Sequence, residues 1–145
     1  MTDLGIALAA IASLDLEKVL LVTPFTQEMN DGIVPILDEA GVHVLADTAM
    51  GYDRQSQYGF LPNSAPRLAA RELLARHPDA NGIYVPCGRI GNVLELTEWE
   101  AEFGLPVITC NQMTIWWALE QFNTYTSSTA CGTLLNRQRA AATSA

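Results

Sequence analysis

Short, nearly continuous apolar runs alternate with segments of helical periodicity along most of this chain. Apolar runs bounded by turn residues are typical of strands that are buried on both faces of a sheet. Strands that alternate with helices are joined by right-handed crossovers, which leaves helices on both faces of a parallel sheet. The sequence therefore predicts an α/β, Rossmann-like fold with a four-stranded parallel sheet in the flavodoxin-like order 2-1-3-4. The predicted strands are residues 18–23, 42–45, 83–86 and 106–109.

Helical spacing marks the segments between these strands. Leu4, Ala7 and Ile11 recur on one face of the first sixteen residues, which predicts an opening amphipathic helix. Residues 46–62 show neither helical nor alternating periodicity, so we expect a long loop there, of the kind that often binds ligands. The remaining helices are expected at residues 27–40, 64–77, 92–103 and 111–122.

The length and charge of the chain limit its class. A chain of 145 residues can bury its own core, and we expect one α/β domain over residues 1–135. Residues 136–145 are expected to form a frayed tail. Eight Lys and Arg stand against sixteen Asp and Glu, a net charge of −8 without a basic cluster. This balance argues against nucleic acid as a partner.

The cysteines and the first helix bear on the compartment. Cys87, Cys110 and Cys131 are an odd number, lack CxxC spacing and have no nearby His in the sequence. They argue against a metal site and favour a reducing, cytoplasmic compartment. The first helix carries Asp3 and Asp15, lacks a basic start and is too short to cross a bilayer. We therefore expect neither a signal peptide nor a membrane anchor.

In open parallel sheets, ligands bind beyond the carboxyl ends of the strands, where the strand order reverses. With the order 2-1-3-4, the loops after the first and third strands face each other across that crevice. The adjoining loop after the fourth strand can also contribute. The candidate substrate-binding residues on these loops are Thr23, Pro24, Phe25, Thr26, Asn30, Gly88, Cys110 and Gln112, and the candidate catalytic residue is Cys87.

Cys87 is the strongest candidate for a reactive group. It follows a strand and precedes Gly88 and a helix, so free backbone N–H groups and a helix dipole are expected to favour its thiolate. Gly88 lets the backbone approach a ligand and can form an anion-binding nest. The alternative is that Cys87 is a small buried apolar residue, and the sequence leaves both interpretations open.

The other candidates have ordinary structural interpretations as well. Cys110 is followed by Asn111 and Gln112, whose side chains suit helix capping as well as ligand binding. Thr23 and Asn30 are equally well explained as a strand end and a helix amide. Cys131 follows no strand end, so a structural role is favoured for it.

Three motifs in order resemble a known family. They are residues 21–25 with Asn30, residues 81–88, and residues 104–112 followed by Trp116. The chain resembles the aspartate/glutamate racemase superfamily, in the branch of maleate cis-trans isomerase and arylmalonate decarboxylase. That family has two pseudo-symmetric α/β halves with the substrate between them. The resemblance covers nearly the whole chain up to Leu135 and is to the C-terminal half only.

The resemblance implies a function and a site. Cys87 is then the second-half cysteine, an acid/base in a cofactor-independent isomerase that acts on a small carboxylic acid, as maleate isomerase does. No metal, flavin or pyridoxal cofactor is implied. Arylmalonate decarboxylase and Asp/Glu racemase activities remain alternatives. The missing half implies a homodimer or a partner chain that supplies it.

The sequence departs from the family at one motif. Phe25 stands where the family usually has a Tyr whose hydroxyl binds the substrate carboxylate, so this hydrogen bond is absent. Gln55 is a candidate replacement for a substrate-binding Asn of the family. Together with the missing half, the departure keeps a second interpretation open, a non-catalytic half-domain that binds or assembles with a partner.

Overall fold

A four-stranded parallel sheet in the order β2-β1-β3-β4 forms the centre of the computed structural model, which describes residues 2–124 and 128–136. The sheet and its order confirm the sequence prediction. Of the expected tail, residues 137–145 lie outside the described residues. The strands are β1 (Lys18–Thr23), β2 (His43–Ala49), β3 (Gly82–Val85) and β4 (Val107–Thr109).

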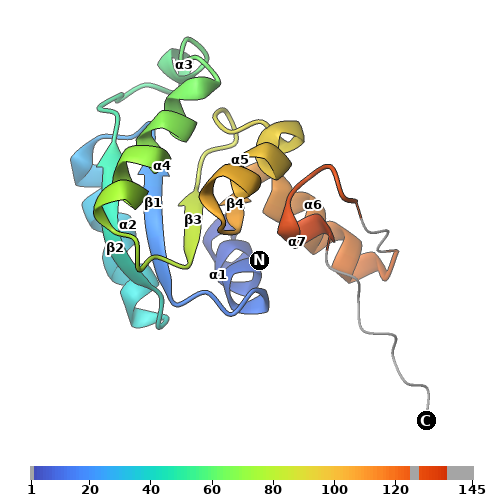
Figure 1. The fold of residues 1–145 in the computed structure, drawn as a ribbon. Coiled ribbons are helices and arrows are strands. Elements are labelled where there is room, and N and C mark those ends of the chain that lie inside the picture. The colour runs from blue at the N-terminus through green and yellow to red at the C-terminus, as the bar shows by residue number, and fades with distance from the viewer. Residues whose placement is uncertain (1, 125–127, 137–145) are drawn as a thin grey trace.

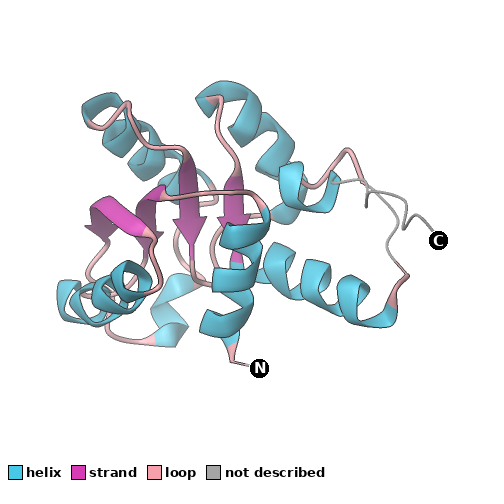
Figure 2. Cartoon of the chain, turned by 90° about the horizontal axis from the view of Figure 1, so that it is seen from below, coloured by secondary structure: helices cyan, strands magenta, loops and turns pink. Residues whose placement is uncertain are grey.

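Helices cover both faces of the sheet (Figures 1 and 2). Alternate residues of β1 explain why: Val19 and Leu21 face one apolar cluster, while Leu20 and Val22 face the other. The first cluster is covered by α1 (Asp3–Ser13), α2 (Gln27–Glu39), α6 (Cys110–Phe122) and α7 (Thr133–Asn136), and the second by α4 (Ser64–Arg76) and α5 (Leu96–Phe103).

No helix in the described part of the chain is long and apolar enough to cross a membrane.

Two local predictions were wrong. Residues 46–62 are not wholly a loop, because β2 continues to Ala49 and a short helix, α3 (Gln55–Tyr58), follows. The strand extends because residues 46–49 pair with β1. The sequence does not indicate this pairing, because residues 46–49 are not a continuous apolar run. The helix expected at residues 92–103 begins instead as a 3₁₀ helix, η1 (Val93–Glu95), before α5.

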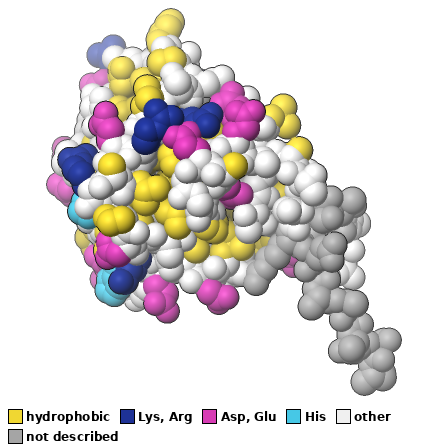
Figure 3. All heavy atoms as spheres, viewed as in Figure 1, with side chains coloured by type: hydrophobic (Ala, Val, Ile, Leu, Met, Phe, Trp, Pro, Cys, Tyr) yellow, Lys and Arg dark blue, Asp and Glu magenta, His cyan; other side chains and the backbone are white. Residues whose placement is uncertain are grey.

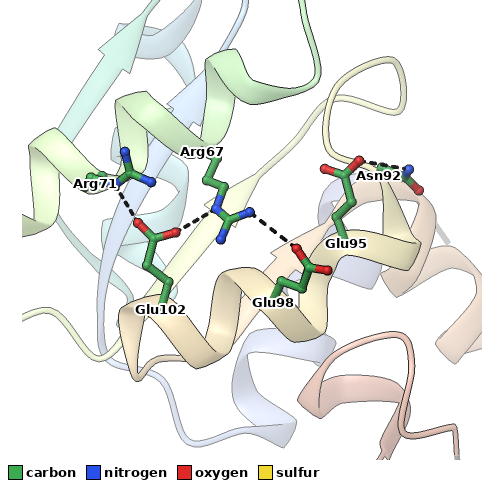
Figure 4. Close-up of polar contacts among 6 residues, drawn as sticks. All are labelled: Arg67, Arg71, Asn92, Glu95, Glu98 and Glu102. Carbon is green, nitrogen blue, oxygen red and sulfur yellow. Dashed lines mark hydrogen bonds and ion pairs between the residues drawn. The ribbon is translucent and has the colours of Figure 1, made fainter.

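A network of ion pairs joins α4 to α5 (Figure 4). Arg67 donates a hydrogen bond to Glu102 at 2.7 Å and lies 3.6 Å from Glu98, while Arg71 donates to the other oxygen of Glu102. The same pattern is visible on the face in Figure 3, where basic side chains lie beside acidic ones. The network links the helix after the α3 segment to the helix after β3.

We predict that Glu102→Gln lowers the free energy of unfolding at neutral pH. The hydrogen bond from Arg71, followed by that from Arg67, lowers the pKa of Glu102 below the ordinary carboxyl value of 4.5. Its stabilising effect is therefore present above pH 4.5 and is lost as the pH falls through the lower, folded-state value.

Urea unfolding at several pH values checks this prediction, with Glu98→Gln as the matched control. Glu98 is highly exposed and makes one longer contact, so its removal should have a smaller effect. The difference between Glu102→Gln and the wild type should shrink in acid. A difference that stays constant with pH would contradict the account.

Candidate functional site

A cavity of about 410 Å³ opens at the carboxyl ends of the central strands. Its walls come from segments far apart in the sequence, namely the start of α1, the loop after β1, α3, the loop after β3 and the start of α6. This is the edge of the sheet at which the strand-end rule places ligands. The cavity is lined by Asp3, Phe25, Gln55, Tyr58, Pro86, Cys87, Gly88, Arg89 and Cys110.

Cys87 lies between the apolar core and this cavity. Its residue is 6% exposed and belongs to the apolar cluster under α4 and α5. It also lines the cavity, and its charge influences both Tyr58 and Cys110 across it. The sulfur is thus sheltered from bulk water and still adjoins a space in which a small ligand fits.

The loop after Cys87 is held in a defined shape. The Ile90 N–H donates to the Cys87 carbonyl at 3.3 Å, and the Asn111 side chain donates to the Gly88 carbonyl at 2.9 Å. A Cβ at position 88 would meet Asn111 Oδ1 at 3.0 Å, so the Asn111 side chain would have to shift to admit a larger residue. The backbone N–H groups of Gly88 and Arg89 donate to no described residue. They remain available to an anion in the cavity.

The helix expected after Cys87 and Gly88, at residues 92–103, is present but does not begin at the cavity. A turn and η1 come first, and α5 begins only at Leu96. The helix that begins at the cavity is α6, whose first residue is Cys110. Burial raises the pKa of the Cys110 thiol, and Asp3 and Cys87 raise it further. Cys110 is therefore a protonated thiol at neutral pH.

Two side chains from α3 line the cavity opposite Cys87's loop. Tyr58 is 4% exposed, and its ring packs against that of Phe25 with centroids 5.8 Å apart. Burial raises the pKa of the Tyr58 hydroxyl, and Cys87 and Asp53 raise it further, so the hydroxyl keeps its proton. Gln55 lies one helical turn before Tyr58 and lines the same cavity. The sequence pointed to Gln55 but not to Tyr58. Residues 46–62 lack periodicity, so no pattern indicates which of their side chains point toward the strand ends.

Arg89 is the cationic residue among the cavity-lining side chains. It is exposed and makes no ion pair or hydrogen bond with a described residue. Asp3 lines the cavity from the start of α1 and is its acidic side chain. Neither Arg89 nor Asp3 was among the site residues predicted from the sequence. Arg89 follows Cys87 by two residues, so the strand-end rule could have included it, whereas nothing in the sequence places Asp3 beside β3.

Thr23 and Asn30 do not line the cavity. Both are fully buried: Thr23 Oγ1 donates to Asn30 Oδ1 at 2.6 Å, and Asn30 Nδ2 donates to Asp47 at 2.7 Å. Thr26 caps α2 by accepting from the Met29 N–H. These contacts fix the loop that carries Phe25, and a direct role of the three residues in substrate binding stays a prediction.

Pro24 and Gln112 also lie outside the cavity lining. The Pro24 carbonyl accepts from the Tyr52 N–H at 3.0 Å, which ties the loop after β1 to the segment before α3. Gln112 is fully buried and exchanges hydrogen bonds with Thr109 in a capping box, while its Nε2 donates to the Cys131 carbonyl at 2.7 Å. The role of Gln112 in substrate binding stays a prediction.

Metal-binding side chains do not converge in the part of the chain that the structure describes. No group of three or more His, Cys, Asp or Glu residues there is arranged to hold a metal ion. All three cysteines are free thiols. The side chains that line the cavity offer thiols, a carboxylate, an amide, a guanidinium and a phenol, next to free backbone N–H groups.

Comparison with known proteins places the chain in a family. A family model described as arylmalonate decarboxylase matches residues 2–135. The chain belongs to the arylmalonate decarboxylase family. This match confirms the branch that the sequence motifs predicted. No sequence among curated proteins matches the chain.

Solved structures share the fold. An arylmalonate decarboxylase has a TM-score of 0.82 and 18% identity, covering 93% of this chain and 60% of its own. A cysteine-to-serine mutant of Nocardia farcinica maleate cis-trans isomerase, with a covalently bound succinylcysteine intermediate, has a TM-score of 0.86 and 21% identity over 94% and 56%. A Pseudomonas putida S16 maleate isomerase mutant with maleate has a TM-score of 0.82 and 22% identity, and the match covers 94% of this chain and 54% of that one. This chain thus spans a little over half the length of each.

We predict that Gln112→Ala lowers the free energy of unfolding by about 1–3 kcal/mol. The substitution leaves the buried Thr109 N–H and the Cys131 carbonyl without their partner, and unpaired polar groups in a protein interior cost free energy of that order. Gln121→Ala, at an exposed amide on the same helix, is the control and should change stability by less than about 0.5 kcal/mol. Urea unfolding measures both. Unchanged stability in Gln112→Ala would contradict the structural role.

Proposed function

We propose that the protein is a cofactor-independent, cysteine-dependent isomerase that acts on a small carboxylic acid, as maleate isomerases do. The observation that supports this function best is that Cys87, the free N–H groups of Gly88 and Arg89, and the unpaired Arg89 guanidinium border one cavity. A thiol next to an anion-binding set suits proton transfer beside a carboxylate. Membership of the arylmalonate decarboxylase family supports the same chemistry.

In the proposed reaction, Cys87 exchanges a proton with the carbon next to a substrate carboxylate. For a cis-trans isomerisation, a nucleophilic thiolate from the second half of the site adds to one alkene carbon, and the C=C electron pair moves onto the carboxylate oxygens as an enolate-like intermediate. The Cys87 thiol then protonates the carbon next to the carboxylate, which leaves a single bond that can rotate. When the Cys87 thiolate removes this proton again, the C=C bond forms anew and the added thiolate leaves. The Arg89 guanidinium and the backbone N–H groups of Gly88 and Arg89 stabilise the negative charge that the oxygens carry.

The two other family reactions share this intermediate. In a decarboxylase, loss of CO₂ leaves the electron pair on the carbon, and in a racemase, loss of the proton does so. Cys87 then protonates the carbon in either case. The family model's description supports the decarboxylase as the next candidate. A substrate panel separates these activities.

A second candidate is a half-domain that acts or binds only with a partner. The chain spans 54–60% of the length of the similar structures, and its cavity lies open at the sheet edge. A second copy of the chain, or a partner chain, would then supply the opposite wall. We further propose a cytoplasmic location, because three free thiols suit a reducing compartment.

We predict that Cys87→Ala abolishes turnover of the substrate within a panel of maleate, phenylmalonate and aspartate. The acid/base group is then missing, so the rate should fall by at least about a hundredfold, the usual contribution of such a group. Cys131→Ala is the control, since Cys131 does not line the cavity. Product formation is followed by NMR. Turnover that survives in Cys87→Ala would eliminate the mechanism, and no turnover by the wild type would favour the half-domain.

We also predict that Arg89→Gln raises the KM for the active carboxylate by about tenfold or more. A hydrogen bond to a charged group contributes roughly 1.5–3 kcal/mol, and each 1.4 kcal/mol changes affinity about tenfold. Thermal stability should stay unchanged, because the exposed Arg89 side chain makes no hydrogen bond or ion pair with a described residue that the substitution could break. Arg76→Gln, remote from the cavity lining, is the matched control. An unchanged KM in Arg89→Gln would remove Arg89 from the site.

A further inference from the structure

The Tyr58 hydroxyl is a donor without an acceptor at the wall of the cavity. The residue is 4% exposed, yet its hydroxyl makes no hydrogen bond with any described residue. Within the described residues, Trp99 Nε1 is the only fully buried side-chain N or O atom without a hydrogen-bond partner, so the Tyr58 oxygen is not fully buried. The oxygen therefore keeps some exposed surface, and the residue that carries it lines the cavity.

The surroundings of Tyr58 fix where that hydroxyl can act. Its ring packs at 54° against Phe25, which carries no polar atom of its own. Tyr58 and Cys87 line the same cavity, so the two groups can contact one ligand. Gln55, one turn earlier on α3, lines the same cavity, which shows that this face of α3 is turned toward it.

A role in packing alone does not account for the hydroxyl. Phe25 and the core under α4 require only an aromatic ring at position 58, whereas the hydroxyl adds a hydrogen-bond donor to a residue that lines the cavity. A phenol that keeps its proton donates a strong hydrogen bond to an anion. Its natural partner in a cavity that also holds the Arg89 guanidinium is an oxygen of a carboxylate.

We propose that the Tyr58 hydroxyl donates a hydrogen bond to a substrate carboxylate, so that the substrate is held between α3 and the loop after Cys87. The assignment rests on the proposed function and adds Tyr58 to its substrate-binding residues. Arg89 offers one charged contact and Tyr58 one neutral donor, within a cavity of about 410 Å³. The pair suits a small dicarboxylate, with one carboxylate on the guanidinium and the other on the phenol.

Binding of succinate, a dicarboxylate that cannot isomerise, tests this assignment without turnover. Bound succinate should shield Cys87 from alkylation by iodoacetamide, and the concentration dependence of that protection, followed by mass spectrometry, gives a dissociation constant. Tyr58→Phe keeps the ring and removes only the hydroxyl, so the protein should fold normally. The variant should bind succinate about tenfold more weakly, as expected for one hydrogen bond to a charged group.

Tyr52→Phe is the matched control, because Tyr52 lies in the same segment and does not line the cavity. It should bind succinate as the wild type does. Equal protection in the wild type and Tyr58→Phe would overturn the assignment, as would a wild type that succinate does not protect.

The test also separates this assignment from the proposed function. Protection that is weakened in Tyr58→Phe while the wild type turns over no substrate supports the Tyr58 contact and rejects the isomerase. Turnover by the wild type with undiminished succinate protection in Tyr58→Phe supports the isomerase and rejects the contact.

Discussion

The parallel pairing of β1 with β3 is the constraint on which the cavity depends. Leu20 pairs with Ile83 and Leu21 with Tyr84, so the two strands end at the same edge of the sheet. The chain leaves β1 toward α2 and leaves β3 toward α5, on opposite faces. The loops therefore diverge there and leave room for a ligand, with Phe25 on one side and Cys87 on the other.

Much of this arrangement could be predicted from the sequence, because buried parallel strands leave continuous apolar runs. β1 was predicted with its exact bounds, and the strand order followed from helix–strand alternation. The strand-end rule then selected Phe25, Cys87, Gly88 and Cys110, all of which line the cavity. The same rule also selected Thr23, whose hydroxyl is buried, because a strand end fixes a position in the fold and not the direction of a side chain.

The remaining parts of the site depend on tertiary contacts that no local pattern records. Tyr58 reaches the cavity because the segment after β2 folds back over the strand ends, held by backbone hydrogen bonds from Met50, Gly51 and Tyr52 to the loop after β1. Gln112 shows the reverse case. Its amide follows a strand end as a ligand-binding residue would, yet hydrogen bonds within α6 and to the Cys131 carbonyl occupy it.

The account requires that one sulfur, Cys87, be open to small anions and that Arg89 attract them. Comparing the alkylation of the folded protein by iodoacetate, which carries a carboxylate, with that by neutral iodoacetamide tests both requirements at once. Site-resolved mass spectrometry should show that Cys87 favours iodoacetate more than Cys131 does, and that Arg89→Gln removes this preference. A Cys87 that resists both reagents in the folded protein, or that shows no preference for the anion, would contradict the account.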